Sequence, residues 1–171
     1  MTGNTYGTYG KLDEDTVLEL FAKYPEFTSY LKDRIVRTYD DDLKVFLTEA
    51  FYHIDYLRGL PSEILVHLAF CMEAWKLEAN DYVFKQDENY QYFVIVFDGL
   101  VELYTDMDKG TEFPIEHLTS GSVINAHQFM IGRKTVVSAR CIKATTLYTM
   151  SAKKFKEIAQ EYPRLLKIFK E

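Results

Sequence analysis

Cysteine is scarce in this sequence, and its scarcity argues against two ways of stabilising a small fold. The 171 residues include only Cys71 and Cys141, which lie far apart in the chain. Two distant thiols predict neither a disulfide scaffold nor a zinc site, so a reducing compartment is the default. An apolar content of 47% and an aromatic content of 15% instead predict one domain of ordinary size with a substantial core.

Positive charge is also in short supply. The formal net charge is −6 at pH 7, and the sequence pI is about 5.3. Because a phosphate backbone demands a positive protein face, these values argue against nucleic acid as a partner.

Long apolar runs are missing. The longest, residues 92–97, has the length of a strand and falls far short of the roughly 20 residues that span a bilayer. The N-terminus has neither the apolar stretch of a signal peptide nor the Arg-rich face of a transit peptide. We therefore expect a cytoplasmic protein with no direct membrane insertion, or one held at the cytosolic face of a membrane complex by another component.

Catalytic and metal-binding motifs are not found. The sequence contains no G-x-x-x-x-G-K-[ST], H-E-x-x-H, G-x-S-x-G or C-x-x-C. Its histidines, His53, His67, His117 and His127, fall in different predicted elements without an obvious partner. The acidic run 40–42 lacks the glycine turn of a calcium loop, and we interpret it as a solvated face or helix start. We predict a protein that is not an enzyme and has no metal or cofactor.

The N-terminal part shows helical periodicity after a short irregular segment. Residues 1–11 have none and predict a flexible arm. A first helix is expected from Asp13 or Asp15 up to Pro25, because acidic residues suit a helix start and proline stops a helix.

A longer helical stretch follows from about Thr28 or Ser29 to Phe51, with apolar residues at steps of three to five. Pro61 is then expected as the first residue of another helix. We assign residues 12–73 to a helical linker or bundle.

The pattern changes to short β-rich runs near Trp75. The pair Asp98–Gly99 predicts a hairpin, and residues 106–110 predict a longer hairpin loop. Many short antiparallel strands predict a closed or nearly closed barrel over residues 74–150. The strands are expected near 75–78, 81–85, 91–97, 100–105, 111–117, 135–143 and 145–150.

Helical periodicity returns at Ser151, a suitable N-cap, and continues to Tyr162 and beyond Pro163. We assign residues 151–171 to a C-terminal helix. The predicted fold class is α+β, with an N-terminal helical bundle, an antiparallel β-barrel and this C-terminal helix.

One stretch, residues 121–141, combines a glycine-led turn, a short amphipathic segment, a basic turn and a β-branched strand. Backbone N–H groups at the start of a helix, with cations nearby, are suited to holding an anion. The stretch therefore predicts an anion-binding insert between two strands.

The barrel block resembles the cyclic-nucleotide-binding domain family. Residues 80–84 and 91–104 are similar to the family's second to fourth strands, in which an aromatic-rich strand ends in a glycine turn and a V-E-x-Y strand. Residues 118–121 resemble the approach to its phosphate-binding cassette, here 121–135. The resemblance implies a jelly-roll-like barrel with a ligand site at the cassette.

The flanking helices resemble the C-linker and C-terminal helix of one branch of that family. Residues 29–73 and 151–169 are similar to regions of cyclic-nucleotide-gated, hyperpolarisation-activated and ether-à-go-go-type channels. This resemblance implies a regulatory region of an ion channel.

The cassette departs from the family where the ligand chemistry lies. The family pattern is Phe-Gly-Glu, a short helix and Arg-x-Ala-x-Val, in which the glutamate accepts from the ribose hydroxyl and the arginine pairs with the cyclic phosphate. Here the first three positions are Ile124, Asn125 and Ala126. Alanine cannot accept that hydrogen bond, and asparagine adds a side chain where close backbone approach is needed. Asn80 and Asp87 also replace family glycines.

The arginine position depends on the register. A gapless count back from Leu147 places Thr135 there, whereas a one-residue insertion places Lys134 there, next to Arg133. Lysine keeps the positive charge but lacks the planar guanidinium group that bonds two phosphate oxygens at once. The degenerate candidate site consists of Gly121, Ile124, Asn125, Ala126, Arg133, Lys134 and Thr135.

Each lost charge-assisted contact weakens binding by about 1.5–3 kcal/mol, or ten- to a hundredfold. The sequence also ends before the helix that closes over the base in the family. We expect no binding of cAMP or cGMP under physiological conditions, and a non-catalytic regulatory or scaffolding domain that contacts proteins in a larger assembly or parent channel.

Two alternatives remain open. One is a functional cAMP or cGMP sensor of a cation channel, with Arg133, Lys134 and the amides of residues 124–129 holding the phosphate, and with membrane spans upstream. The other is a complete small subunit of a larger assembly, which the Met1 start and the short length suit.

Overall fold

The computed structural model describes residues 14–26, 42–107 and 110–168. The chain divides into two compact units, Met1–Tyr39 and Asp40–Glu171, and each is described by itself. The first unit contains α1 (Glu14–Lys23), which ends before Pro25 as predicted. The arm predicted over residues 1–11, and the part of the longer helix predicted before residue 42, lie outside the described residues.

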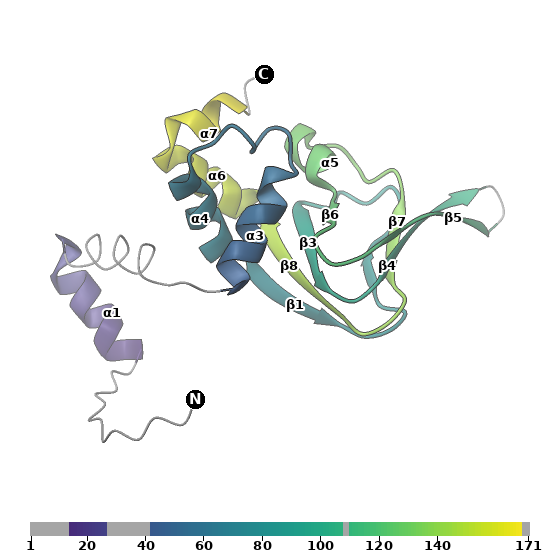
Figure 1. Ribbon diagram of the computed structural model, residues 1–171, viewed down its shortest axis with the longest axis horizontal. Coiled ribbons are helices and arrows are strands. Elements are labelled where there is room, and N and C mark those ends of the chain that lie inside the picture. The colour runs from purple at the N-terminus through teal and green to yellow at the C-terminus, as the bar shows by residue number, and fades with distance from the viewer. Residues whose placement is uncertain (1–13, 27–41, 108–109, 169–171) are drawn as a thin grey trace. The chain divides into compact units, whose positions relative to one another are not determined.

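The second unit has a layer of helices against one sheet (Figure 1). The helices of this layer are α3 (Asp42–Tyr52), α4 (Ser62–Phe70), α6 (Ala152–Glu161) and α7 (Pro163–Ile168). Their apolar faces form one buried cluster with strand residues, in which Phe51, Phe93 and Phe155 are fully buried. The helices therefore cover one sheet face and bury their apolar sides against it, as a layered fold requires.

The described residues of this unit form eight strands in two antiparallel sheets of four, in the orders β1-β8-β3-β6 and β2-β7-β4-β5. A second buried cluster, including Val94, Val101 and Leu147, fills the space between them. The α+β, jelly-roll-like fold class is confirmed, although the strands form two sheets and not one closed barrel. The strands are β1 (Glu73–Leu77), β2 (Tyr82–Phe84), β3 (Tyr92–Asp98), β4 (Val101–Met107), β5 (Thr111–Leu118), β6 (Val123–Ile124), β7 (Ser138–Cys141) and β8 (Thr145–Ser151).

The hairpin predicted at Asp98–Gly99 is wrong. β3 and β4 belong to different sheets, so this turn carries the chain from one sheet to the other. Gly99 has φ +124°, and a Cβ there would lie 2.3 Å from Oγ1 of Thr145. The glycine is therefore required by a close strand crossing and not by strand pairing. The hairpin predicted over residues 106–110 is confirmed, since β4 pairs with β5.

Two helix starts were predicted from single residues. Ser151 caps α6 as predicted, because its hydroxyl accepts a hydrogen bond from the Lys154 amide at 3.2 Å. Pro61 is the N-cap of α4, with ψ 142°, and not its first helical residue. Within the described residues, no helix is long and apolar enough to cross a membrane.

Candidate functional site

The segment of residues 121–135, hereafter the cassette, lies between β5 and β7 and contains β6 and a short helix, α5 (Ala126–Ile131). It begins at Gly121, whose φ of +85° allows the tight turn. The Gly121 amide donates to the Val96 carbonyl at 2.8 Å, and β6 pairs with β3. The cassette is therefore anchored at the middle of β3, with Ile124 buried between the sheets.

Asn125, at the start of α5, bonds to the first residue of β3 and to a residue just before that strand. Its φ is +64°, a left-handed conformation that asparagine tolerates better than most residues. Its side-chain amide donates to the carbonyls of Tyr92 at 2.7 Å and Tyr90 at 3.3 Å. Both of its N–H groups are thus bonded within the protein.

Ala126 connects α5 to the turns between α3 and α4. Its carbonyl accepts a hydrogen bond from the Tyr56 hydroxyl at 3.1 Å. Burial raises the pKa of Tyr56 well above its usual value, so this hydroxyl stays a donor. The Ala126 methyl group offers no acceptor to a ligand.

Edge-to-face aromatic contacts hold the buried side of α5. Phe129 meets Phe93 of β3 with ring centroids 5.3 Å apart, and Phe155 of α6 at 5.5 Å, both edge-to-face. Such pairs add to the apolar burial of each ring. The position of α5 is therefore set by contacts with β3 and α6.

Lys134 and Thr135, the two candidates for the position of the family arginine, differ in exposure. After Gly132 ends α5 with φ +63°, Arg133 and Lys134 are exposed, whereas Thr135 is only 2% exposed. The inward position at this point of the cassette is therefore occupied by a threonine, and both neighbouring cations are at the surface.

Thr135 joins the cassette to the turn that follows β2. Its hydroxyl donates to the Lys85 carbonyl at 2.6 Å and accepts from the Glu88 amide at 3.2 Å. Its backbone amide and carbonyl bond to Glu88 and Asp87 at 3.0 and 2.9 Å. These bonds engage the polar groups of Thr135 within the protein.

The positive-φ residues other than glycine in the described chain are Asn80, Asp87 and Asn125. They are the three positions at which the sequence replaces glycines of the family that it resembles. Asn and Asp tolerate this conformation through short polar side chains. The substitutions therefore preserve the backbone path and add side chains to it.

The sequence did not predict that Tyr90 is partly buried with its hydroxyl inside the protein. Its ring packs against the cluster between the sheets, 4.8 Å from the Phe84 ring and 5.5 Å from the Tyr92 ring. Its hydroxyl is buried and lacks a hydrogen-bond partner among the described residues. Burial is the main cause that raises the pKa of Tyr90 well above its usual value. The aromatic-rich composition was a signal, but composition does not tell which ring points inward.

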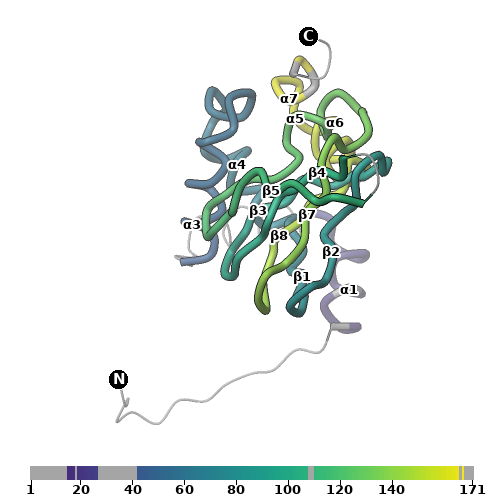
Figure 2. Tube along the Cα trace, turned by 90° about the vertical axis from the view of Figure 1, so that its right-hand side faces the viewer, coloured from purple at the N-terminus to yellow at the C-terminus, as the bar shows by residue number. Residues whose placement is uncertain are grey.

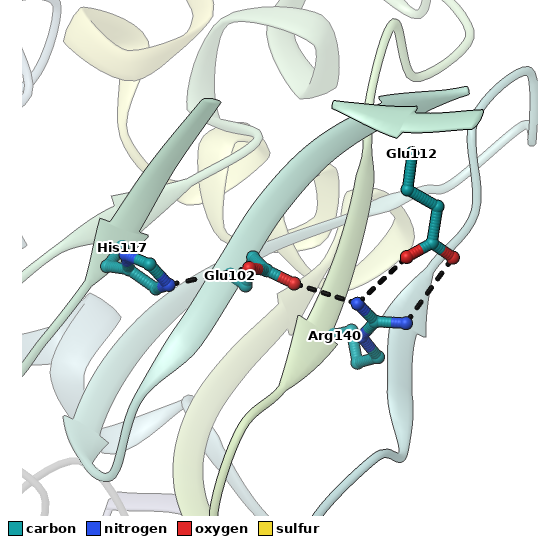
Figure 3. A network of polar contacts seen from close by, with 4 residues as sticks. All are labelled: Glu102, Glu112, His117 and Arg140. Atoms are coloured by element: carbon teal, nitrogen blue, oxygen red, sulfur yellow. Dashed lines mark hydrogen bonds and ion pairs between the residues drawn. The ribbon is translucent and has the colours of Figure 1, made fainter. Parts of the chain in front are cut away.

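Arg140, in the strand after the cassette, faces away from the interior (Figure 3). It alternates along β7 with the buried Ala139 and Cys141. Its guanidinium lies 2.8 Å from Glu102 and 3.0 Å from Glu112, and Glu102 also lies 3.4 Å from His117. This charged network therefore belongs to the outer face of the β2-β7-β4-β5 sheet.

Other reactive side chains are scattered over the described part of the chain. No group of three metal-ligating residues occurs there. His67 lies 2.9 Å from the Tyr162 hydroxyl, and neither Cys71 nor Cys141 takes part in a disulfide. Burial raises the pKa of Cys141, which makes its thiol less reactive.

Residues 74–162 match the model of the cyclic nucleotide-binding domain family. The chain belongs to this family. No curated protein sequence matches the chain significantly. The family match agrees with the two sheets and the cassette just described, and it adds nothing specific to channel linker regions.

Solved structures support the same fold. The catabolite activator protein of Thermus thermophilus is 16% identical, with a TM-score of 0.58, over 71% of this chain and 55% of that one. The regulatory domain of Toxoplasma gondii PKA, solved with cAMP, is 17% identical, with a TM-score of 0.63, over 70% and 46%. A regulatory subunit of a cAMP-independent protein kinase A from Trypanosoma cruzi, bound to guanosine, is 16% identical, with a TM-score of 0.57, over 74% and 44%. The matched region thus spans about half the length of these proteins.

Proposed function

We propose that this protein is a non-catalytic regulatory or scaffolding member of the family whose interior nucleotide site is degenerate. It acts through protein contacts in a larger assembly, on the cytoplasmic side of any membrane involved. The observation that carries the proposal is the inward position of Thr135, whose polar groups bond to residues 85–88. A cyclic phosphate needs a cation at such a position, and threonine supplies none.

Two further features support the proposal. Ala126 has no side-chain acceptor for a ribose hydroxyl, and the Asn125 side chain bonds back to the protein. Each missing charge-assisted contact weakens binding by about 1.5–3 kcal/mol. Two such losses would move a micromolar site toward the millimolar range.

Isothermal titration of the full chain with cAMP, cGMP and guanosine tests the proposal. We expect no saturable heat at micromolar concentrations of the cyclic nucleotides. Micromolar binding that is lost in Lys134→Ala, and retained in the matched exposed variant Lys76→Ala, would overturn it. Guanosine is included because it carries no phosphate, so a site without the cation could still accept it.

The alternative function is a working cyclic-nucleotide sensor in the cytosolic region of a cation channel. It is favoured by the exposure of Arg133 and Lys134, which leaves both cations accessible, and by the sequence resemblance to channels. This alternative predicts that Arg133→Ala and Lys134→Ala each weaken cAMP binding, whereas the proposed function predicts no binding to weaken.

A further inference from the structure

A groove with a volume of about 490 Å³ lies outside the sheets. It is bounded by the end of α5, the residues before β3 and one side of α6. Figure 2 shows α5, α6 and α7 gathered at the same end of the second unit. The groove is separate from the interior position of Thr135, which does not line it.

The groove combines three kinds of lining. Met130, Ile131 and the buried Ala159 provide apolar surface, and Arg133 and Lys156 provide positive charge. Side-chain amides provide both donors and acceptors. These amides belong to Asn89, Gln91, Gln128 and Gln160.

The two cations are exposed and uncompensated. Among the described residues, no carboxylate lies within ion-pair distance of Arg133 or Lys156. Residues 132–168 contain nine Lys and Arg against two Glu, a net charge of +7. Residues 42–131 contain five Lys and Arg against fifteen Asp and Glu, a net charge of −10. Arg133 and Lys156 come from the net-positive range, and they are the charged residues of the groove lining in an otherwise acidic protein.

We propose that this groove binds an acidic, amphipathic peptide segment of a partner protein. Carboxylates of the segment pair with Arg133 and Lys156, its apolar side chains contact Met130 and Ile131, and the groove amides bond its main chain. The inference rests on the proposed function, because it names the surface through which the module makes its protein contacts.

Other polyanions fit the groove less well. A membrane surface is flat and would not reach Ala159, a buried part of the apolar lining. A nucleic acid needs many cations along its phosphate backbone, whereas the groove lining supplies two, Arg133 and Lys156. A small anion would use the two cations but leave the apolar and amide lining without a role.

Selection of a random peptide library, displayed on phage and presented with the immobilised full chain, provides the first test. We expect enriched peptides in which Asp or Glu alternates with Leu, Ile or Phe. The enrichment should disappear with Arg133→Glu/Lys156→Glu. It should persist with Lys76→Glu/Lys143→Glu, which makes the same charge change at exposed residues outside the groove. No enrichment, or enrichment that survives the groove variant, overturns the proposal.

Fluorescence anisotropy with the most enriched peptide provides the second test. We expect Arg133→Glu and Lys156→Glu each to weaken binding by about tenfold or more, and Ile131→Ser to weaken it measurably. Equal binding of all variants overturns the proposal, as does displacement of the peptide by an equal concentration of inorganic phosphate. Cyclic-nucleotide binding beside intact peptide binding would instead overturn only the proposed function.

Discussion

The two sides of the cassette use their polar groups in opposite ways. On the inner side, Asn125 and Thr135 bond to the β2–β3 region at distances between 2.6 and 3.3 Å. On the outer side, Arg133 lines an open groove together with Lys156 of α6, and neither cation has a described carboxylate partner.

This difference separates a structural role from a binding role. A polar group that is bonded within the fold stabilises it, and displacing that bond for a ligand costs roughly what the bond contributes. An exposed cation has no such bond to lose. Substitutions on the inner side should therefore lower the free energy of unfolding, whereas substitutions on the outer side should weaken binding and leave the free energy of unfolding nearly unchanged.

Phe129→Ala should give the largest effect on stability. The ring is 6% exposed and contacts Phe93 and Phe155, so its removal should lower the free energy of unfolding by about 3–5 kcal/mol. Ile131→Ala, on the same helix but 47% exposed, should lower it by about 0.5 kcal/mol. Urea denaturation measures both, and similar losses would mean that the two sides of α5 do not differ.

Thr135→Val should give the next largest effect. The shape is kept, but the Glu88 amide loses its bond to the hydroxyl and the Lys85 carbonyl loses its donor. The free energy of unfolding should fall by about 1–3 kcal/mol. Lys134→Ala, one residue earlier and exposed, should change it by less than about 0.5 kcal/mol. If Lys134→Ala lowered the free energy of unfolding as much as Thr135→Val, the assignment of the structural role to Thr135 would be wrong.

Asn125→Ala and Asn125→Gly sharpen the comparison further. Both remove the bonds to Tyr90 and Tyr92, but only alanine must also adopt φ +64°. Because a left-handed alanine is disfavoured by about 1–2 kcal/mol, Asn125→Ala should unfold at lower urea concentration than Asn125→Gly. The reverse order would contradict a left-handed backbone conformation at residue 125.

Tyr90→Phe should have the smallest effect at neutral pH. It removes a buried hydroxyl without a described partner, so stability should stay constant or rise by up to about 1 kcal/mol. The folded-state pKa of Tyr90 is raised above the usual value near 10. The unfolded chain therefore loses this proton first, and stability falls as the pH rises above about 10. Urea denaturation between neutral and alkaline pH should show a smaller fall for Tyr90→Phe, and an equal fall would contradict this assignment.

Strand positions were largely predictable because β-branched and aromatic runs form most of them. The two-residue β6 was missed, since a pair of apolar residues carries no periodicity, and β7 begins at Ser138 and not near Thr135. Pairing was not predictable at Asp98–Gly99. A glycine turn signals a change of direction, but which sheet each strand joins depends on distant partners.

The residues of the candidate site could be identified from the sequence, but the directions in which their side chains point could not. The replaced glycines at Asn80, Asp87 and Asn125 are readable in the sequence, and the structure adds that they keep positive φ. Whether Lys134 or Thr135 points inward depends on hydrogen bonds to residues 85–88, some fifty positions earlier in the chain. No local pattern encodes such contacts.

The most direct test of the central claim is the free energy of unfolding of the wild-type chain with and without about 1 mM cAMP or cGMP. A ligand that binds only the folded state with micromolar affinity would stabilise it by about 4 kcal/mol at that concentration. We predict a change of less than about 0.5 kcal/mol, as expected for a dissociation constant near or above the millimolar range. Stabilisation by several kcal/mol would contradict the account and show that the interior site still binds its nucleotide.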